Sequence, residues 1–148
     1  MGQQQILLIV LSVILVGIAI AVGITMFQAQ AEQSNIDAII SDLNNLGSQA
    51  YQYYIRPTSM GGGSQSYENF SAYFITLPAN MLENENAIYR ATPTTAATTS
   101  VVIMARSKFD DTVLRSVTVA NDGTMTIQTT VADATWNAGL PANAAHDI

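Results

Sequence analysis

The chain opens with a long block of apolar residues. From Ile6 to Phe27 it carries no charge, and Ser12 and Thr25 are the only polar residues. At about 1.5 Å per residue, a helix over this block would be about 33 Å long, enough to cross the hydrocarbon core of a bilayer. The block is longer than the apolar region of a cleaved signal, and no Lys or Arg precedes it. We therefore expect it to be retained in the working protein, surrounded by lipid or by other protein.

A second helical pattern follows without a break. Apolar residues recur at steps of three and four, separated by Asp, Asn, Ser and Gln, as in a helix with one buried face. Gly47 is expected to be tolerated inside this helix, and Arg56-Pro57 to end it, because the residue before a proline disfavours the α conformation. The sequence thus predicts one helix over about residues 4–54. Its second half is expected to pack on the head through Ile36, Ile39, Ile40, Leu43, Leu46, Ala50, Tyr53 and Tyr54.

The stretch after the helix is less clear. Residues 60–65 are glycine-rich and indicate a loop. Residues 66–76 are ambiguous but fit a short helix with Ser66 as its N-cap, ended by Leu77 and Pro78. Its aromatic face would contain Tyr67, Phe70, Tyr73 and Phe74. Residues 80–86 are expected to form a loop.

From residue 87 onward the pattern is that of strands. β-Branched residues are frequent, and strands are expected over residues 87–92, 101–106, 112–120 and 124–131. Asn121-Asp122-Gly123 supplies a hairpin turn, since glycine accepts a positive φ. The apolar face of this hairpin would contain Val113, Val117, Val119, Met125 and Ile127. Residues 92–100 indicate a turn-like connector.

These elements predict an α+β fold in two parts. Residues 1–30 form an apolar helical segment. Residues 31–148 form a head, in which the amphipathic half-helix 31–55 covers a three- or four-stranded antiparallel sheet at about residues 87–131. In the tail, Trp136 and Leu140 are expected to dock on the head.

The charge distribution excludes several classes of partner. Eleven acids and five bases give a net charge of −6, and every charged residue lies at or beyond Glu32. No basic stripe is present to neutralise phosphates, so neither nucleic acid nor an anionic lipid surface is expected as a partner. Without cysteine, disulfides and thiolate metal sites are excluded.

We find no constellation that would support catalysis. His146 lies two residues from the C-terminus and is expected to be solvated. The acids Asp110, Asp111 and Asp122 lack EF-hand spacing, and residues 60–65 lack the P-loop lysine. The sequence therefore predicts a protein that is not an enzyme and has no cofactor or metal. Tyr51, Tyr53 and Tyr54 are expected to pack where the helix meets the head.

The layout resembles the type IV pilin family. The likeness is carried by Gly2 before the apolar block, by the block itself, and by the apolar stripe that ends at Tyr54. In that family the apolar helices pack together as the core of an extracellular helical filament and the heads form its wall. The resemblance implies a structural subunit whose partners are copies of itself, the cytoplasmic membrane before assembly, and the pilus assembly machinery.

Two family features do not map onto this sequence. The family cleaves after a glycine preceded by a basic leader and keeps a glutamate five residues into the mature chain. Here Met1 alone precedes Gly2, and the matching position, counted from Gln3, is Leu7. In the family, that glutamate forms a salt bridge to the terminal amine of a neighbouring subunit. Here hydrogen bonds between subunits from Gln3, Gln4 and Gln5 would take the place of that salt bridge.

Small residues interrupt the apolar block. Ala19 and Gly23 form a small-xxx-small pair, which permits close helix approach, and Gly17 and Gly23 also permit local unwinding. The contacts of a filament core are expected from Ile6, Leu7, Ile9, Val10, Val13, Ile14, Gly17, Ile18, Ala21, Gly23, Ile24 and Phe27.

Two alternatives to a filament subunit stay open, a single-span membrane-anchored exported domain and a pseudopilin of a secretion system. A filament is favoured because small residues would have no role in a lone anchor.

The sequence also contains candidate sugar acceptors. Asn69-Phe70-Ser71 matches the N-glycosylation pattern. The connector offers O-linked sites if it faces outward, at Thr94, Thr95, Thr98 and Thr99.

Overall fold

The computed structural model describes residues 2–92, 99–129 and 136 of the 148-residue chain. The chain divides into two compact units, Met1–Ser34 and Asn35–Ile148. Helix α1 (Gly2–Ile55) supplies the described part of the first unit and the first helix of the second. The single helix predicted over residues 4–54 is confirmed, and it extends slightly further at both ends.

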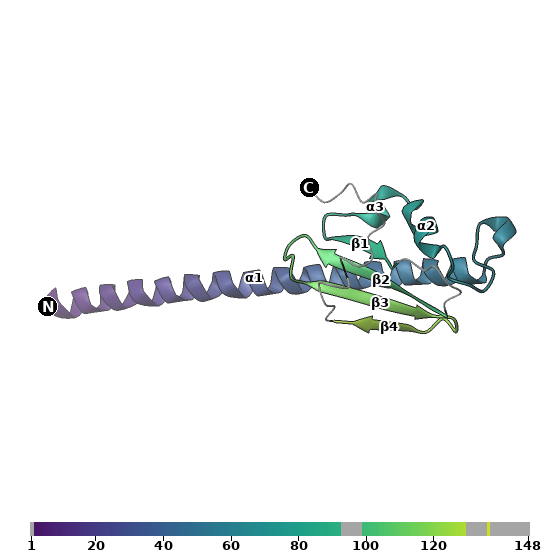
Figure 1. Cartoon of the computed structure of the whole chain (residues 1–148). Helices are drawn as coiled ribbons and strands as arrows, with labels where there is room; N and C mark the ends of the chain where they lie inside the picture. The colour runs from purple at the N-terminus through teal and green to yellow at the C-terminus, as the bar shows by residue number, and fades with distance from the viewer. Residues whose placement is uncertain (1, 93–98, 130–135, 137–148) are drawn as a thin grey trace. The chain divides into compact units, whose positions relative to one another are not determined.

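The second unit contains a four-stranded antiparallel sheet whose strands are ordered as they occur in the chain (Figure 1). The strands are β1 (Ala87–Ala91), β2 (Ser100–Ser107), β3 (Leu114–Ala120) and β4 (Met125–Gln128). Tyr89 is paired with Ala105, Ile103 with Val117, and Val119 with Met125. With α1, this sheet makes the protein an α+β fold. The four predicted strands are present, with ends that differ by up to three residues.

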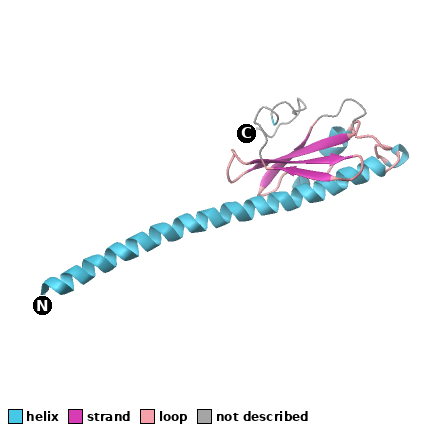
Figure 2. Ribbon diagram, turned by 90° about the horizontal axis from the view of Figure 1, so that it is seen from below, coloured by secondary structure: helices cyan, strands magenta, loops and turns pink. Residues whose placement is uncertain are grey.

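One face of the sheet packs on α1, and Figure 2 shows the strands running over the second-unit part of the helix. Side chains alternate between the two faces of a strand, so every second residue enters this core. The sheet contributes Ala87, Tyr89, Ala91, Val101, Ile103, Ala105, Val117 and Val119. Helix α1 contributes Ile39, Leu43, Leu46, Ala50 and Tyr53.

Gly47 allows the sheet to approach α1 closely. A Cβ added at this glycine would lie 3.1 Å from Met125 Sδ and 3.3 Å from Val119 Cγ2. Both distances are shorter than ordinary van der Waals contact between such atoms. The helix therefore tolerates Gly47, as predicted, and its missing side chain makes room for β3 and β4.

The opposite face of the sheet is covered by Trp136, which is buried against Met104 and Leu114. The Arg90 guanidinium carbon lies 4.5 Å from the centre of the Trp136 rings, a cation–π arrangement. The predicted docking of Trp136 is thus confirmed, and Leu140 lies outside the described residues. The hairpin prediction was wrong at Val113, which precedes β3. The strand begins at Leu114, whose side chain enters the Trp136 cluster.

Three short helices join α1 to the sheet: η1 (Thr58–Met60), α2 (Phe70–Ile75) and α3 (Ala79–Leu82). The predicted cap of α2 was wrong. Asn69 holds the N-cap position at φ 61°, while the Ser66 hydroxyl accepts a hydrogen bond from the Glu68 N–H within the preceding turn. The loop predicted over residues 80–86 was also wrong in part. Its first residues belong to α3, where Glu83 N–H bonds to Ala79 O, and Glu83 then bridges to Ile88.

Candidate assembly surface

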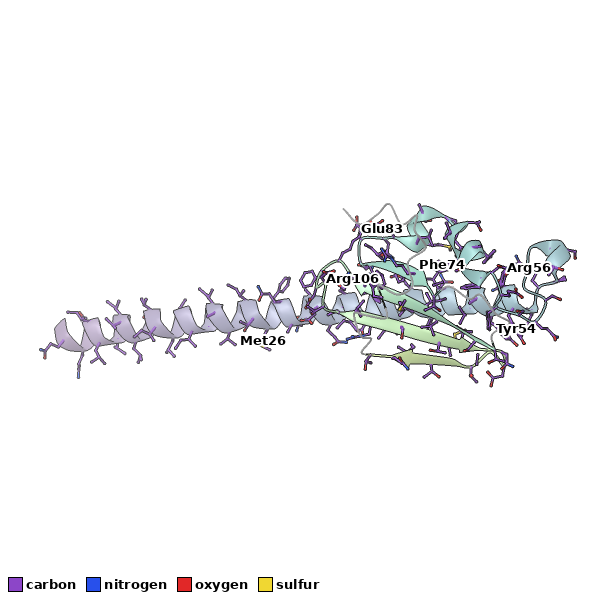
Figure 3. The ribbon with its side chains drawn as sticks, viewed as in Figure 1. Met26, Tyr54, Arg56, Phe74, Glu83 and Arg106 are labelled. Carbon is purple, nitrogen blue, oxygen red and sulfur yellow. The ribbon has the colours of Figure 1, made fainter. Side chains whose placement is uncertain are left out.

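The first unit presents an apolar helix surface on every side. The large apolar side chains between Ile6 and Phe27 are all exposed, from 50% at Leu11 to 74% at Phe27. Side chains such as Met26, which is 61% exposed, project outward from the helix (Figure 3). Every residue predicted for a filament core lies on this surface. The prediction omitted residues that are equally exposed: Leu8, Leu11, Leu15, Val16, Ile20, Val22 and Met26.

The two polar residues in this block hydrogen-bond within their own helix. Ser12 Oγ donates to Ile9 O and Thr25 Oγ1 donates to Val22 O, each at 2.8 Å. Hydroxyl groups bonded in this way can enter an apolar environment without leaving a donor unsatisfied. The whole block can therefore be transferred from water at little polar cost.

Small residues form two notches on this surface. Gly17 and Ala21 are one helical turn apart, as are Ala19 and Gly23, and the two pairs lie about 200° from each other around the helix axis. A Cβ added at Gly17 or Gly23 would have no atom within 4 Å apart from its own helix and chain neighbours. The helix is unbroken across both glycines, so the unwinding that the sequence permits is absent from this described segment. Both notches are open to a second helix.

The second unit uses its part of α1 differently. Of the eight residues expected to pack on the head, the described structure buries Ile39, Leu43, Leu46, Ala50 and Tyr53. Ile36, Ile40 and Tyr54 are half-buried. In the second unit, therefore, a single face of the helix is covered by the sheet and its neighbouring elements.

Two polar clusters join α1 to the sheet, and neither was predicted from the sequence. In the first, Ser107 Oγ donates to Asn35 Oδ1 at 2.8 Å, and Asn35 Nδ2 donates to Asn86 O at 3.4 Å. In the second, Asp42 accepts hydrogen bonds from the hydroxyl of Tyr89 and the amide of Asn84. Burial, and then the hydrogen bond to Asp42, raise the pKa of the Tyr89 phenol. The residues are more than forty positions apart in the sequence, so no local pattern reports them.

The tyrosines at the end of α1 belong to an aromatic cluster, which agrees with the packing role predicted for them. Tyr53 lies 5.4 Å from Phe70 and 4.8 Å from Tyr73, and Tyr54 lies 4.8 Å from Tyr67, all between ring centres. The Tyr67 hydroxyl donates to Ala120 O at 3.1 Å. Burial raises the pKa of Tyr67 to about 12.

Two of the acids considered as metal ligands, Asp110 and Asp122, are hydrogen-bonded by nearby threonines. Asp110 and Asp122 each accept two hydrogen bonds, from Thr112 and Thr124, which lower the pKa of both carboxyls. Among the described residues, no three His, Cys, Asp or Glu side chains come together as a metal site.

The structure places only part of the sugar-acceptor set. Asn69 and Thr99 are exposed. Thr94, Thr95 and Thr98 lie outside the described residues. Exposure is required of an acceptor but does not identify one.

One helix, α1, contains a segment long and apolar enough to cross a membrane, judged by length and composition. Comparison of the chain with protein-family models, with curated proteins and with solved structures gave no match. The apolar surface of the first unit is therefore the feature on which a functional proposal depends.

Proposed function

We propose that this protein is the structural subunit of an extracellular helical filament, similar to a type IV pilus, and that it polymerises through its apolar N-terminal helix. The observation that carries the proposal is the uncharged apolar surface around the whole helix, exposed by 50% or more at every large side chain between Ile6 and Phe27. A soluble protein does not leave so much continuous apolar surface in water. The helix therefore needs a partner whose surface is also apolar.

Copies of the same helix provide that partner. Each Ile, Leu or Val that becomes fully buried contributes about 1.5–3 kcal/mol relative to the same side chain exposed to water. The absence of charge between Ile6 and Phe27 removes like-charge repulsion when identical helices meet. The notches at Gly17–Ala21 and Ala19–Gly23 face different directions, so one helix can contact two neighbours through different surfaces. Contacts between two different surfaces generate a helical polymer when the rotation between neighbours does not close a ring.

Before assembly the same helix would lie in the cytoplasmic membrane. Its length and composition suit a bilayer, and the internally bonded Ser12 and Thr25 add little cost. The chain would then exchange lipid contacts for contacts with its own copies. Assembly machinery of the pilus type would be needed to extract it.

A second candidate is an exported domain that stays anchored by this single span, either alone or as a pseudopilin. The membrane-compatible length of the helix favours it equally. It differs in its outcome, because an anchored protein gives detergent-soluble monomers and leaves no fibres in the medium after the cells are sheared.

The test is negative-stain microscopy of sheared cell supernatants, with mass spectrometry of any fibre. Gly17→Leu and Ile18→Asp should abolish fibres. A Cβ added at position 17 has no atom within 4 Å apart from its own helix backbone and chain neighbours, so the effect of Gly17→Leu would report contacts between molecules. Ile18→Leu is the matched control and should assemble normally. The fragment 31–148 should fold and stay monomeric, and fibres formed by that fragment alone would contradict the proposal.

A further inference from the structure

A hydrogen-bonded loop, residues 57–66, closes the C-terminal end of α1. The N–H of Gly63 donates to Tyr53 O at 2.8 Å, and that of Gln65 donates to Tyr54 O at 2.7 Å. Ser64 N–H donates to Arg56 O at 2.9 Å. Carbonyl groups that a helix end normally leaves to water are thus satisfied by the loop.

The shape of this loop is set by its backbone. A Cβ at Gly62 would lie 2.1 Å from Arg56 O, and a Cβ at Gly63 would lie 1.9 Å from Ser66 O, so neither position can carry a side chain without a shift of the chain. Ser64 and Gln65 adopt positive φ values of 51° and 66°. Non-glycine residues occupy this region at an energetic cost and are held there by their surroundings. The backbone therefore holds this loop in one defined conformation.

The loop and the end of α1 present two apolar side chains and one base. Met60, in the loop, is 71% exposed, and Ile55, the last residue of α1, is 57% exposed. Arg56, labelled in Figure 3, makes no side-chain hydrogen bond or ion pair within the described part of the chain. The other bases are engaged. Lys108 pairs with Glu83, Arg106 with Asp111, Arg115 donates to the carbonyls of Leu114 and Thr129, and Arg90 lies over Trp136.

The other end of the second unit presents an exposed aromatic side chain together with acids. The turn between β2 and β3 carries Phe109, which is 63% exposed. This turn is fixed next to the start of the unit, since Ser107 Oγ bonds to Asn35 and Lys108 N–H donates to Asn86 O at 3.0 Å. Two acids belong to this end of the unit. Asp110 follows Phe109 and is held in a turn by Thr112, and the exposed Glu85 precedes Asn86, whose carbonyl accepts the bond from Lys108.

The two surfaces lie at opposite ends of the unit. The α1 residues from Asn35 to Ile55 separate them, a distance of about 30 Å at 1.5 Å per residue. In Figure 3, Arg56 lies at one end of the unit, and Arg106, on the strand that leads into the Phe109 turn, lies toward the other. They are too far apart to meet within one molecule.

We propose that these surfaces bind each other between copies of the chain, with Met60 against Phe109 and Arg56 facing Glu85 and Asp110. This inference rests on the proposed filament and names a contact between its heads. Charge complementarity favours a second copy of the chain as the partner. The chain has a net charge of −6, and Arg56 is the base for which the described residues provide no side-chain partner, so an acidic surface of a second copy suits it. Each copy carries both halves of the contact, so the contact can repeat from copy to copy along the proposed filament.

Glu68 lies near the Met60 end, where its backbone carbonyl accepts a hydrogen bond from the Tyr53 hydroxyl. Its charge is opposite to that of Arg56 and is not part of the proposed contact. It therefore provides a matched control for an effect of charge at that end.

The first test uses crosslinking, because the chain has no cysteine of its own. The double variant Met60→Cys, Phe109→Cys is assembled into filaments and treated with a short bismaleimide. A ladder of covalent oligomers on a denaturing gel is the expected result, while each single variant should give none beyond a dimer. The matched control is Ile75→Cys with Phe109→Cys, since Ile75 is similarly exposed at 58% on α2. Filaments that yield no ladder, or an equal ladder from the control pair, would overturn the contact.

The second test is a charge exchange and does not depend on the cysteine variants. Arg56→Glu should reduce the yield of sedimented filaments at least about twofold, as expected from loss of an exposed ion pair. Glu85→Arg in the same chain should restore the yield, and Glu68→Lys should leave it unchanged. A yield that is insensitive to Arg56→Glu, or is not restored by Glu85→Arg, contradicts the contact while the filament itself stands. Absence of fibres from the parent chain overturns both proposals.

Discussion

The hydroxyl of Tyr89 donates a hydrogen bond to a carboxylate oxygen of Asp42 at 2.6 Å and so joins β1 to α1. The Asn84 amide donates to the same oxygen at 2.8 Å. Tyr89 is buried at 3% exposure. Because the geometry of a hydrogen bond is specific, the cluster fixes the register between helix and sheet as apolar contacts alone would not.

Tyr89→Phe should lower the free energy of unfolding of the fragment 31–148 by about 1–3 kcal/mol, because it removes a hydrogen bond to a charged group. Urea denaturation measures the change. Tyr73→Phe is the control, since the described structure gives the Tyr73 hydroxyl no hydrogen bond, and it should change the value by less than about 0.5 kcal/mol. Equal effects of the two substitutions would contradict the importance of the Asp42 contact.

Gly47→Ala should destabilise the same fragment by about 1 kcal/mol. The gain in helix propensity, about 1 kcal/mol, is outweighed by overpacking against Met125 and Val119, which costs about 1–3 kcal/mol. Met125→Ala in the same chain should remove part of that overpacking, so that the double variant loses less than the sum of the single changes. Additive losses would show that Gly47 is not in tight contact with β4.

The stability of the second unit should fall at high pH. Burial raises the pKa of Tyr67 to about 12, above its ordinary value of 10.0. Between these two values the unfolded chain releases the phenol proton while the folded chain retains it. The stabilisation is therefore complete below pH 10 and is lost as the pH rises toward 12. Denaturation curves of the fragment over this range should show the decline, and Tyr67→Phe should make it shallower. An unchanged slope in that variant would refute the assignment to Tyr67.

Trp136→Ala should destabilise the fragment by about 3–5 kcal/mol, as expected when a buried aromatic residue is truncated. Trp136 is 2% exposed and covers Met104 and Leu114 on the sheet face opposite α1. Trp136→Phe should lose less, because it keeps part of the apolar cover. Calorimetry gives both values, and a Trp136→Ala fragment that melts like the parent would show that this face needs no cover.

Local periodicity was sufficient to predict the elements that a chain segment forms by itself. The steps of three and four residues from Ile39 to Tyr53 predicted the covered face of α1, and the Asn121-Asp122-Gly123 turn placed the β3–β4 hairpin. The predicted docking of Trp136 was also correct. In each case the information lies in neighbouring residues or in the type of one residue.

Features that depend on distant residues could not be predicted in this way. The bonds from Asp42 to Tyr89 and from Asn35 to Ser107 join polar residues that look solvated in the sequence. Asn69 replaces Ser66 as the cap of α2 because Tyr67 is drawn into the core before the helix begins. The apolar block has no polar face, so its sequence pattern does not distinguish residues that contact a neighbouring helix from residues that do not. The predicted filament-core set therefore left out residues that are equally exposed.

The proposed filament requires the segment from Ile6 to Phe27 to lie at the centre of the mature assembly. Helical reconstruction of native fibres by cryo-electron microscopy measures this directly. We predict that the apolar helices of many copies pack together along the fibre axis, with Gly17 and Gly23 in contact with neighbouring helices and the sheets on the outside. Fibres with the heads at the axis, or single molecules with this helix still in a bilayer and no fibre, would contradict it.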